Sequence, residues 1–189
     1  MARGFQRVNG ELQCNLDGAE IEVISGLLQE LSALLQPAQS TADLDPLAVE
    51  LGLADLSAPT PPTTPDDPIL GRLLPSGYRD DDMAAADFRK YTDDSLRRAK
   101  LADAAIVRAG LQLAEPDGTI RIGDDDIDCW LRAINDLRLA LGVQLGITTE
   151  EPDGWQHLEE GDSRFHLAVI YDFLTWWQDT LLTAAIDSD

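Results

Sequence analysis

Two cysteines, Cys14 and Cys129, have the most reactive side chains in this sequence. A thiol reacts as its thiolate, so its surroundings decide its reactivity. Cys14 alternates with Leu12 and Leu16 in a predicted strand, which places it on an apolar face. Cys129 lies near the start of a predicted helix, where the helix dipole lowers a thiol pKa and the preceding acidic run raises it. Two interpretations remain open: a redox pair, or two small buried hydrophobic residues.

Arg138 is the second residue with unusual placement, because it falls inside the apolar arc of a helix predicted over 127–145. An unpaired buried charge is costly, so its guanidinium must have partners. One interpretation is an ion pair with an acidic residue of a packed helix. The other is an anchor for a carboxylate or backbone group of a binding partner. Asn135 and Asp136 lie beside this face and are candidate hydrogen-bond partners.

A basic face is predicted on a long helix over 84–113, formed by Arg89, Lys90, Arg97, Lys100 and Arg108. The opposite, apolar face is predicted to pack on the core and consists of Phe88, Tyr91, Ala99, Ala102, Ile106 and Leu113. A contiguous basic face can dock on phosphates or on an acidic partner. A solvated helix face opposite a core stripe explains the same pattern.

The sequence contains no recognisable catalytic, cofactor or metal motif. There is no phosphate-binding glycine loop, nucleophile elbow or HExxH sequence. His157 and His166 are not at metal-ligand spacing, and the Asp runs at 80–82 and 124–126 lack the calcium-loop pattern. The residues therefore indicate no recognisable catalytic centre, although sequence spacing does not reveal carboxylates paired from distant segments, and we expect no cofactor or metal.

The overall composition is strongly acidic, with a net charge of -21 and a pI near 4.1 over 189 residues. Such a charge repels polyanions, so direct nucleic-acid binding over the whole surface is disfavoured. The beginning of the chain lacks the apolar run of a signal peptide, and no stretch is long and apolar enough for a membrane span. We expect a cytoplasmic protein with reduced thiols.

The pattern of elements predicts a mainly α fold. Alternation around the Asn9-Gly10 turn indicates an N-terminal β-hairpin, and residues 119–122 indicate a short strand that can join it. Amphipathic segments predict helices from Asp17 to about Leu35, after Asp67-Pro68, over 84–113, over 127–145 and over 164–186. We expect one domain over 1–189: a helical bundle with a small antiparallel sheet and a Pro/Thr-rich loop at about 54–66.

Three stretches resemble a known family: 67–78, then 88–92 with Leu96, Arg97 and Lys100, then 130–146. The run Asn-Asp-Leu-Arg-Leu-Ala-Leu-Gly at 135–142 is the most specific of them. Together they are similar to an actinobacterial domain-of-unknown-function family whose members are described as oxidative-stress transcriptional regulators. The resemblance covers nearly the whole chain, except the Pro/Thr-rich loop and the acidic loop before the last helix.

The resemblance implies a cytoplasmic, non-enzymatic regulator that senses oxidation through cysteines and works with the transcription machinery through a partner such as a sigma factor. The sequence departs from that picture because it has no closely spaced cysteine pair.

Three hypotheses follow. The first is a regulator that binds a protein partner. The second is a direct DNA binder that uses the basic face around Arg89, Lys90, Arg97 and Lys100. The third is an unrecognised small-molecule-binding protein or enzyme with a pocket near Arg138. A symmetric homodimer is the oligomer that general statistics favour.

Overall fold

The computed structural model describes residues 2–36, 67–75, 77 and 82–186, without the side chains of 82, 84–87 and 89–91. The Pro/Thr-rich loop expected at 54–66 lies outside these residues, and so do the aspartates at 80 and 81. The single-domain assignment therefore remains a prediction for the chain as a whole.

The sheet is three-stranded and antiparallel, with the order β1-β2-β3. The strands are β1 (Arg3–Val8), β2 (Glu11–Asn15) and β3 (Thr119–Ile122). Asn9 and Gly10 both have positive φ, 54° and 86°, as the predicted hairpin turn requires. Leu12 pairs with Ile122 and Cys14 with Ile120, so the apolar side chains of β2 and β3 share one buried face. The predicted addition of the 119–122 strand to the hairpin is confirmed.

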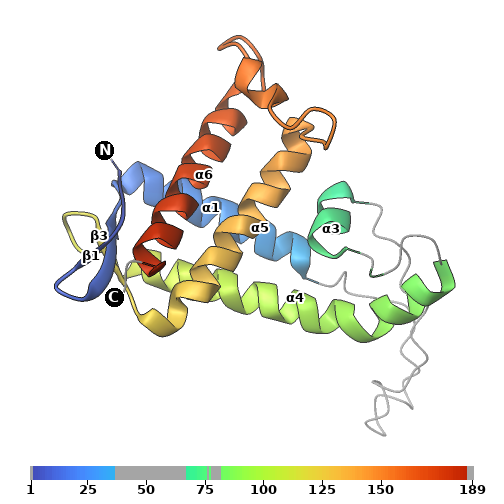
Figure 1. The fold of residues 1–189 in the computed structure, drawn as a ribbon, viewed down its shortest axis with the longest axis horizontal. Helices are drawn as coiled ribbons and strands as arrows, with labels where there is room; N and C mark the ends of the chain where they lie inside the picture. Colours follow the sequence, from blue (N-terminus) through green and yellow to red (C-terminus); the bar gives the residue numbers. More distant parts are fainter. Residues whose placement is uncertain (1, 37–66, 76, 78–81, 187–189) are drawn as a thin grey trace, which may run out of the picture.

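Helices make up most of the fold, which confirms the mainly α class. They are α1 (Gly18–Leu35), α3 (Pro68–Leu73), α4 (Asp82–Gln112), α5 (Ile127–Leu145) and α6 (Phe165–Ile186). In Figure 1, α5 and α6 lie side by side, α4 runs beneath them, and α3 sits beside α5. None of the helices within the described ranges has the length and apolar character that crossing a membrane requires.

Helix ends follow the signals in the sequence. Asp17 and Glu20 form a capping box at the start of α1, and the Asp67 carboxylate accepts the backbone N–H groups of Ile69 and Leu70. Gly146 ends α5 in the left-handed conformation, with φ 75°. The start of α5 differs from the prediction: Asp124–Asp126 form a separate 3₁₀ turn, and Asp126 makes no side-chain cap.

An aromatic cluster joins the sheet to α5 and α6. Phe5 of β1 stacks on Trp177 of α6 at 5.0 Å between ring centroids. Trp130 of α5 meets both rings edge-on, at 6.0 Å from Phe5 and 5.8 Å from Trp177. These large rings are almost completely buried and supply much of the apolar area that holds the three elements together.

The predicted core face of α4 is wrong. The fully buried positions in its described part are Asp103, Ala104, Val107 and Leu111. Ala99 and Ala102 are exposed instead, and Leu113 is 81% exposed. The helix is therefore turned so that Lys100, expected in solvent, lies on the buried side with its side chain 15% exposed.

Gly110 permits the close approach of α4 and α5, because a Cβ there would lie 2.6 Å from the Trp130 ring. We predict that Gly110→Ala lowers the free energy of unfolding by about 1–3 kcal/mol through overpacking. Gly26→Ala is the matched control, since nothing lies within 4 Å of its Cβ position in α1. That change is expected to raise the free energy of unfolding by about 0.5–1 kcal/mol. Urea unfolding followed by tryptophan fluorescence measures both, and equal effects of the two substitutions would contradict the prediction.

Candidate functional site

The interface between α4 and α5 contains a buried ion pair. Lys100 Nζ lies 2.6 Å from Asp136 Oδ1, and the two side chains are 15% and 5% exposed. Burial raises the pKa of Asp136, and the ion pair with Lys100 limits that rise. Lys100 therefore forms a structural ion pair and is not part of a free basic surface. Asp136 was predicted as a partner for Arg138 and binds Lys100 instead.

A second charged group lies on the same interface. Arg132 donates two hydrogen bonds to the buried Asp103 carboxylate, at 2.7 and 2.8 Å. Burial alone raises the pKa of Asp103, but the hydrogen bonds and charge of Arg132 outweigh it and lower that pKa overall. Arg132 Nη2 also lies 3.4 Å from Cys129 Sγ, so one thiol belongs to this group.

The two cysteines are free and lie in different environments. Burial raises the pKa of the Cys14 thiol to about 12, and a contact with the Trp177 side chain offsets only part of this rise. Burial and the Asp103 carboxylate raise the pKa of the half-buried Cys129 thiol. Cys14 is buried as predicted. Neither thiol has the lowered pKa typical of a reactive cysteine, so the redox role of both stays a prediction.

Arg138 has neutral partners, which corrects the expected ion pair. Its Nε donates to Thr175 Oγ1 at 3.1 Å, and its Nη1 donates to Gln178 Oε1 at 2.5 Å. The guanidinium also lies over the Tyr171 ring, 5.5 Å from its centroid. All three partners come from α6, so Arg138 is held in one orientation and keeps its charge uncompensated within the described part of the chain. Asn135 is half-buried on the same helix.

The basic face predicted on α4 is not assembled as a free surface in the part that the structure describes. Arg97 Nη1 donates to the Leu35 carbonyl at the end of α1, at 3.1 Å, and Lys100 is in the buried pair. The backbones of Arg89 and Lys90 lie in α4, and their side chains are outside the described set.

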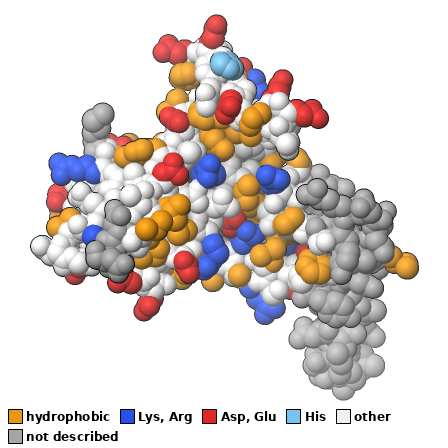
Figure 2. Space-filling model, viewed as in Figure 1, with side chains coloured by type: hydrophobic (Ala, Val, Ile, Leu, Met, Phe, Trp, Pro, Cys, Tyr) orange, Lys and Arg blue, Asp and Glu red, His pale blue; other side chains and the backbone are white. Residues whose placement is uncertain are grey.

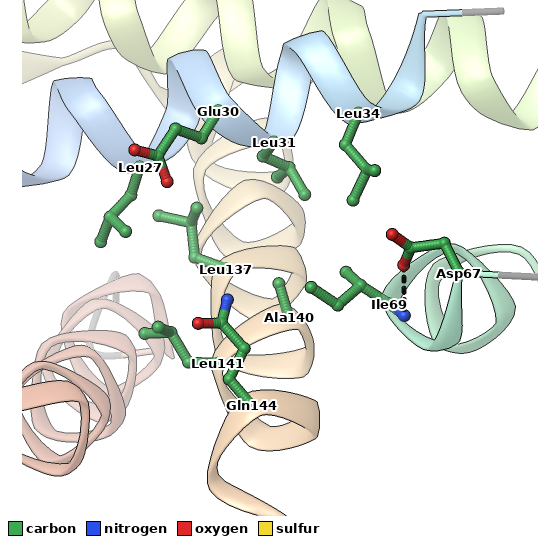
Figure 3. A pocket seen from close by; sticks show the side chains of 10 residues that line it. All are labelled: Leu27, Glu30, Leu31, Leu34, Asp67, Ile69, Leu137, Ala140, Leu141 and Gln144. Atoms are coloured by element: carbon green, nitrogen blue, oxygen red, sulfur yellow. Dashed lines mark hydrogen bonds between the residues drawn. The ribbon is translucent and has the colours of Figure 1, made fainter. Parts of the chain in front are cut away.

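A groove lies where α1, α3 and α5 meet (Figure 3). Its cavity volume is about 230 Å³. Most of the lining side chains are apolar, and three acidic or amide groups complete the lining: Leu27, Leu31, Leu34, Ile69, Leu137, Ala140 and Leu141, with Glu30, Asp67 and Gln144. In Figure 3 the leucines of α1 point from above towards α5 and α3.

A second apolar hollow, of about 280 Å³, lies between α1 and α6. It is lined by Val23 and Ile24 of α1 and by Val169, Ile170 and Phe173 of α6, and Val23 and Val169 are 44% and 54% exposed. At 100° per residue, Glu20, Val23, Leu27, Glu30 and Leu34 share one side of α1. The two hollows therefore follow one line along α1, which we call the α1 groove.

The α1 groove was not predicted from the sequence, although a signal was present. The apolar arc of α1 includes Val23 and Leu34 in addition to the stripe of Ile24, Leu28, Leu31 and Leu35. Such an arc is wider than one packing interface needs. The additional apolar residues, Val23 and Leu34, are the ones that remain partly exposed.

Comparison with known proteins identifies relatives of the whole chain. A model of the family described as Domain of unknown function (DUF2017) matches residues 2–185. The chain is 32% identical over 178 residues to a Mycobacterium leprae protein named "Putative oxidative stress regulator AosR", covering 87% of this chain and 78% of that protein. It is also 32% identical over 181 residues to "Oxidative stress regulator AosR" of Mycobacterium tuberculosis H37Rv, and this comparison covers 89% of this chain and 79% of that protein. No solved structure matches the chain.

The Lys100–Asp136 pair gives a test of the buried interface. We predict that Lys100→Met lowers the free energy of unfolding by about 3–5 kcal/mol at neutral pH, because Asp136 remains buried without its counter-charge. Because burial raises the pKa of Asp136, this deficit is largest at neutral pH and shrinks as the pH falls towards the unfolded-state value of about 3.9. Chemical unfolding of the variant and the parent at several pH values measures the difference.

The double variant Lys100→Met/Asp136→Leu is the control for that experiment, because it removes both charges together. It is expected to recover most of the lost stability, since apolar replacement of a complete buried pair is close to neutral. A double variant as unstable as the single one would show that the loss comes from packing rather than from the unpaired charge.

Proposed function

This chain belongs to the family described as Domain of unknown function (DUF2017), and from that premise we propose that it is a non-enzymatic transcriptional regulator that acts through a protein partner. Relatives in two mycobacterial species are named as oxidative stress regulators, and each comparison covers more than three quarters of both chains. The proposed process is therefore the response to oxidative stress, and the proposed compartment is the cytoplasm, where transcription takes place.

The α1 groove is the observation that carries this proposal. Partly exposed apolar side chains in a hollow rimmed by polar groups are typical of a protein-binding surface. The two hollows that make up the groove lie along α1 between Glu20 and Leu34, which is roughly 20 Å at the helical rise. A partner helix of about four turns fits this length and would insert its apolar face in the mode of helix-in-groove recognition.

The acidic side chains that line the groove indicate which residues flank the apolar face of the partner helix. Glu20, Glu30 and Asp67 line the groove, on a protein with a net charge of -21. A partner helix with basic residues beside its apolar stripe is complementary to this rim and is attracted from a distance. We infer that the partner is a component of the transcription apparatus, such as a sigma factor, that presents a segment of this kind.

Direct DNA binding is the less favoured function. Of the four basic residues proposed for it, Lys100 is in a buried ion pair and Arg97 binds the end of α1. Both are committed to the fold, and the remaining surface is dominated by acidic residues that repel phosphates.

Substitutions in the groove test the protein-partner function. Val23 and Leu34 line the two halves of the groove, are partly exposed and do not belong to the packed core. We predict that Val23→Glu and Leu34→Glu each weaken binding to purified sigma factor or RNA polymerase at least about tenfold, the effect of losing one central apolar contact. Leu113→Glu, at an 81% exposed position just after the end of α4, is expected to leave binding unchanged.

Biolayer interferometry with the purified components measures these affinities, and circular dichroism verifies the fold of each variant. Tight, sequence-specific binding of the unmodified chain to DNA alone, together with no binding to any transcription component, would refute the protein-partner function.

The proposed function includes sensing of oxidants through a cysteine. Cys129 is the candidate for this role, because it is the more accessible of the two thiols. We predict that iodoacetamide at neutral pH modifies Cys129 more slowly than an unfolded thiol and leaves Cys14 unmodified until the protein unfolds, because the pKa of each thiol is raised. Asp103→Asn removes a charge that raises the Cys129 pKa and is expected to accelerate its modification. Mass spectrometry of the alkylated peptides gives the rates, and rapid modification of Cys14 in the folded protein would contradict the assigned environment.

A further inference from the structure

A hollow of about 420 Å³ lies on the other flank of α5, between the end of α3, the turn after α5, and α6. Its volume is within the range of small-molecule sites. Three apolar side chains form one part of the lining, and hydroxyl and basic groups form the rest: Leu139, Val143 and Ile147, with Thr148, Thr149, Tyr171, Arg72 and Arg138. None of the lining side chains is acidic, in a protein that has 35 acidic and 14 basic residues.

Arg138 is already oriented as a ligand-binding group. Its bonds to Thr175 and Gln178 use two of the five guanidinium N–H donors and fix the plane of the group. Neither partner is charged, so the cation keeps its full charge beside the hollow. A charge fixed in this way loses little conformational entropy when it binds a ligand.

Arg72 supplies the second cation from the last turn of α3. Among the described residues it has no hydrogen-bond or ion-pair partner, and its side chain is exposed. In the view of Figure 2, several Lys and Arg side chains lie near the middle of the molecule, and most acidic side chains lie nearer its edges. Two arginines at one hollow favour a carboxylate, because the guanidinium fork matches its two oxygens.

We propose that this hollow binds a small organic carboxylate with a planar or apolar body. Arg72 and Arg138 hold the carboxylate, and the body packs against the Tyr171 ring and the aliphatic side chains of Leu139, Val143 and Ile147. The site is separate from the α1 groove and does not depend on the proposed protein partner.

Benzoate is a suitable probe, because it joins one carboxylate to a flat apolar ring. In a titration followed by ¹H–¹⁵N NMR of the full chain, we expect saturable shifts of the amides at 138–149 and 171. Benzyl alcohol, which keeps the ring and lacks the charge, is expected to bind at least about tenfold more weakly, as for loss of a charge-assisted hydrogen bond.

Arg72→Gln tests the assignment with little risk to the fold, since Arg72 is exposed. It is expected to weaken benzoate binding at least about tenfold. Arg72→Lys keeps the positive charge without the paired N–H donors of a guanidinium group, and it is expected to reduce the affinity for benzoate less. Arg98→Gln is the matched control, because Arg98 is an exposed arginine of α4 that does not line the hollow.

Three results would overturn the proposal. The first is an absence of benzoate-induced shifts in these residues. The second is equal binding of benzyl alcohol, which would identify an apolar hollow with no use for the arginines. The third is binding of inorganic phosphate in place of benzoate, which would assign the arginines to a phosphate ligand instead.

Discussion

The ion pair between Lys100 and Asp136 determines how α4 sits on the rest of the protein. A lysine and an aspartate that are both nearly buried must meet, because the energetic penalty of an isolated buried charge is large. One turn further along α4, the buried Asp103 carboxylate also needs a counter-charge, which the more exposed Arg132 supplies. Together the two pairs fix the rotation of α4 about its axis, and therefore which residues of α4 contact α1 and α5.

The same pairs explain where inference from sequence failed. Strands, helices, the Asn9-Gly10 turn, the Asp17 and Asp67 caps and the Gly146 terminus are specified by local rules and were predicted correctly. The face of α4 depends on a partner 36 residues away from Lys100 along the chain. The rule that charged residues face solvent takes no account of that distant partner. The prediction therefore placed the buried face of α4 in solvent and the exposed face in the core.

Arg138 illustrates a related limit. Its position on the apolar arc of α5 correctly indicated that the guanidinium lies against a packed helix, but its hydrogen-bond partners in the described part of the chain are neutral and not acidic. Thr175 and Gln178 are ordinary polar residues on α6 and only their place beside Arg138 gives them a role. Because they satisfy hydrogen bonds without neutralising charge, Arg138 has no counter-charge among the residues that the structure describes, and this property is visible only in three dimensions.

Besides the side that packs on α6, helix α5 has three further sides as a consequence of this packing. The side with Asp136 and Arg132 faces α4, the side with Ala140 and Gln144 borders the α1 groove, and the side with Leu139 and Gly142 borders the arginine-lined hollow. Gly142 is buried beside the hollow, and a Cβ added at this position would lie 3.9 Å from the Tyr171 ring. The most specific run of the family resemblance, 135–142, covers these sides and the contact of Arg138 with α6, so its residues take part in several separate contacts rather than in one site.

The strongly acidic surface and the apolar groove have different roles in the proposed partner binding. Charge acts over about a Debye length, roughly 8 Å at physiological salt, and mainly accelerates the encounter with a basic partner. Burial of Val23, Leu34 and their neighbours acts at contact and sets the rate of dissociation. A protein built in this way distinguishes a basic amphipathic segment from nucleic acid, because polyanions are repelled before they reach the groove, and apolar segments without basic flanks arrive more slowly.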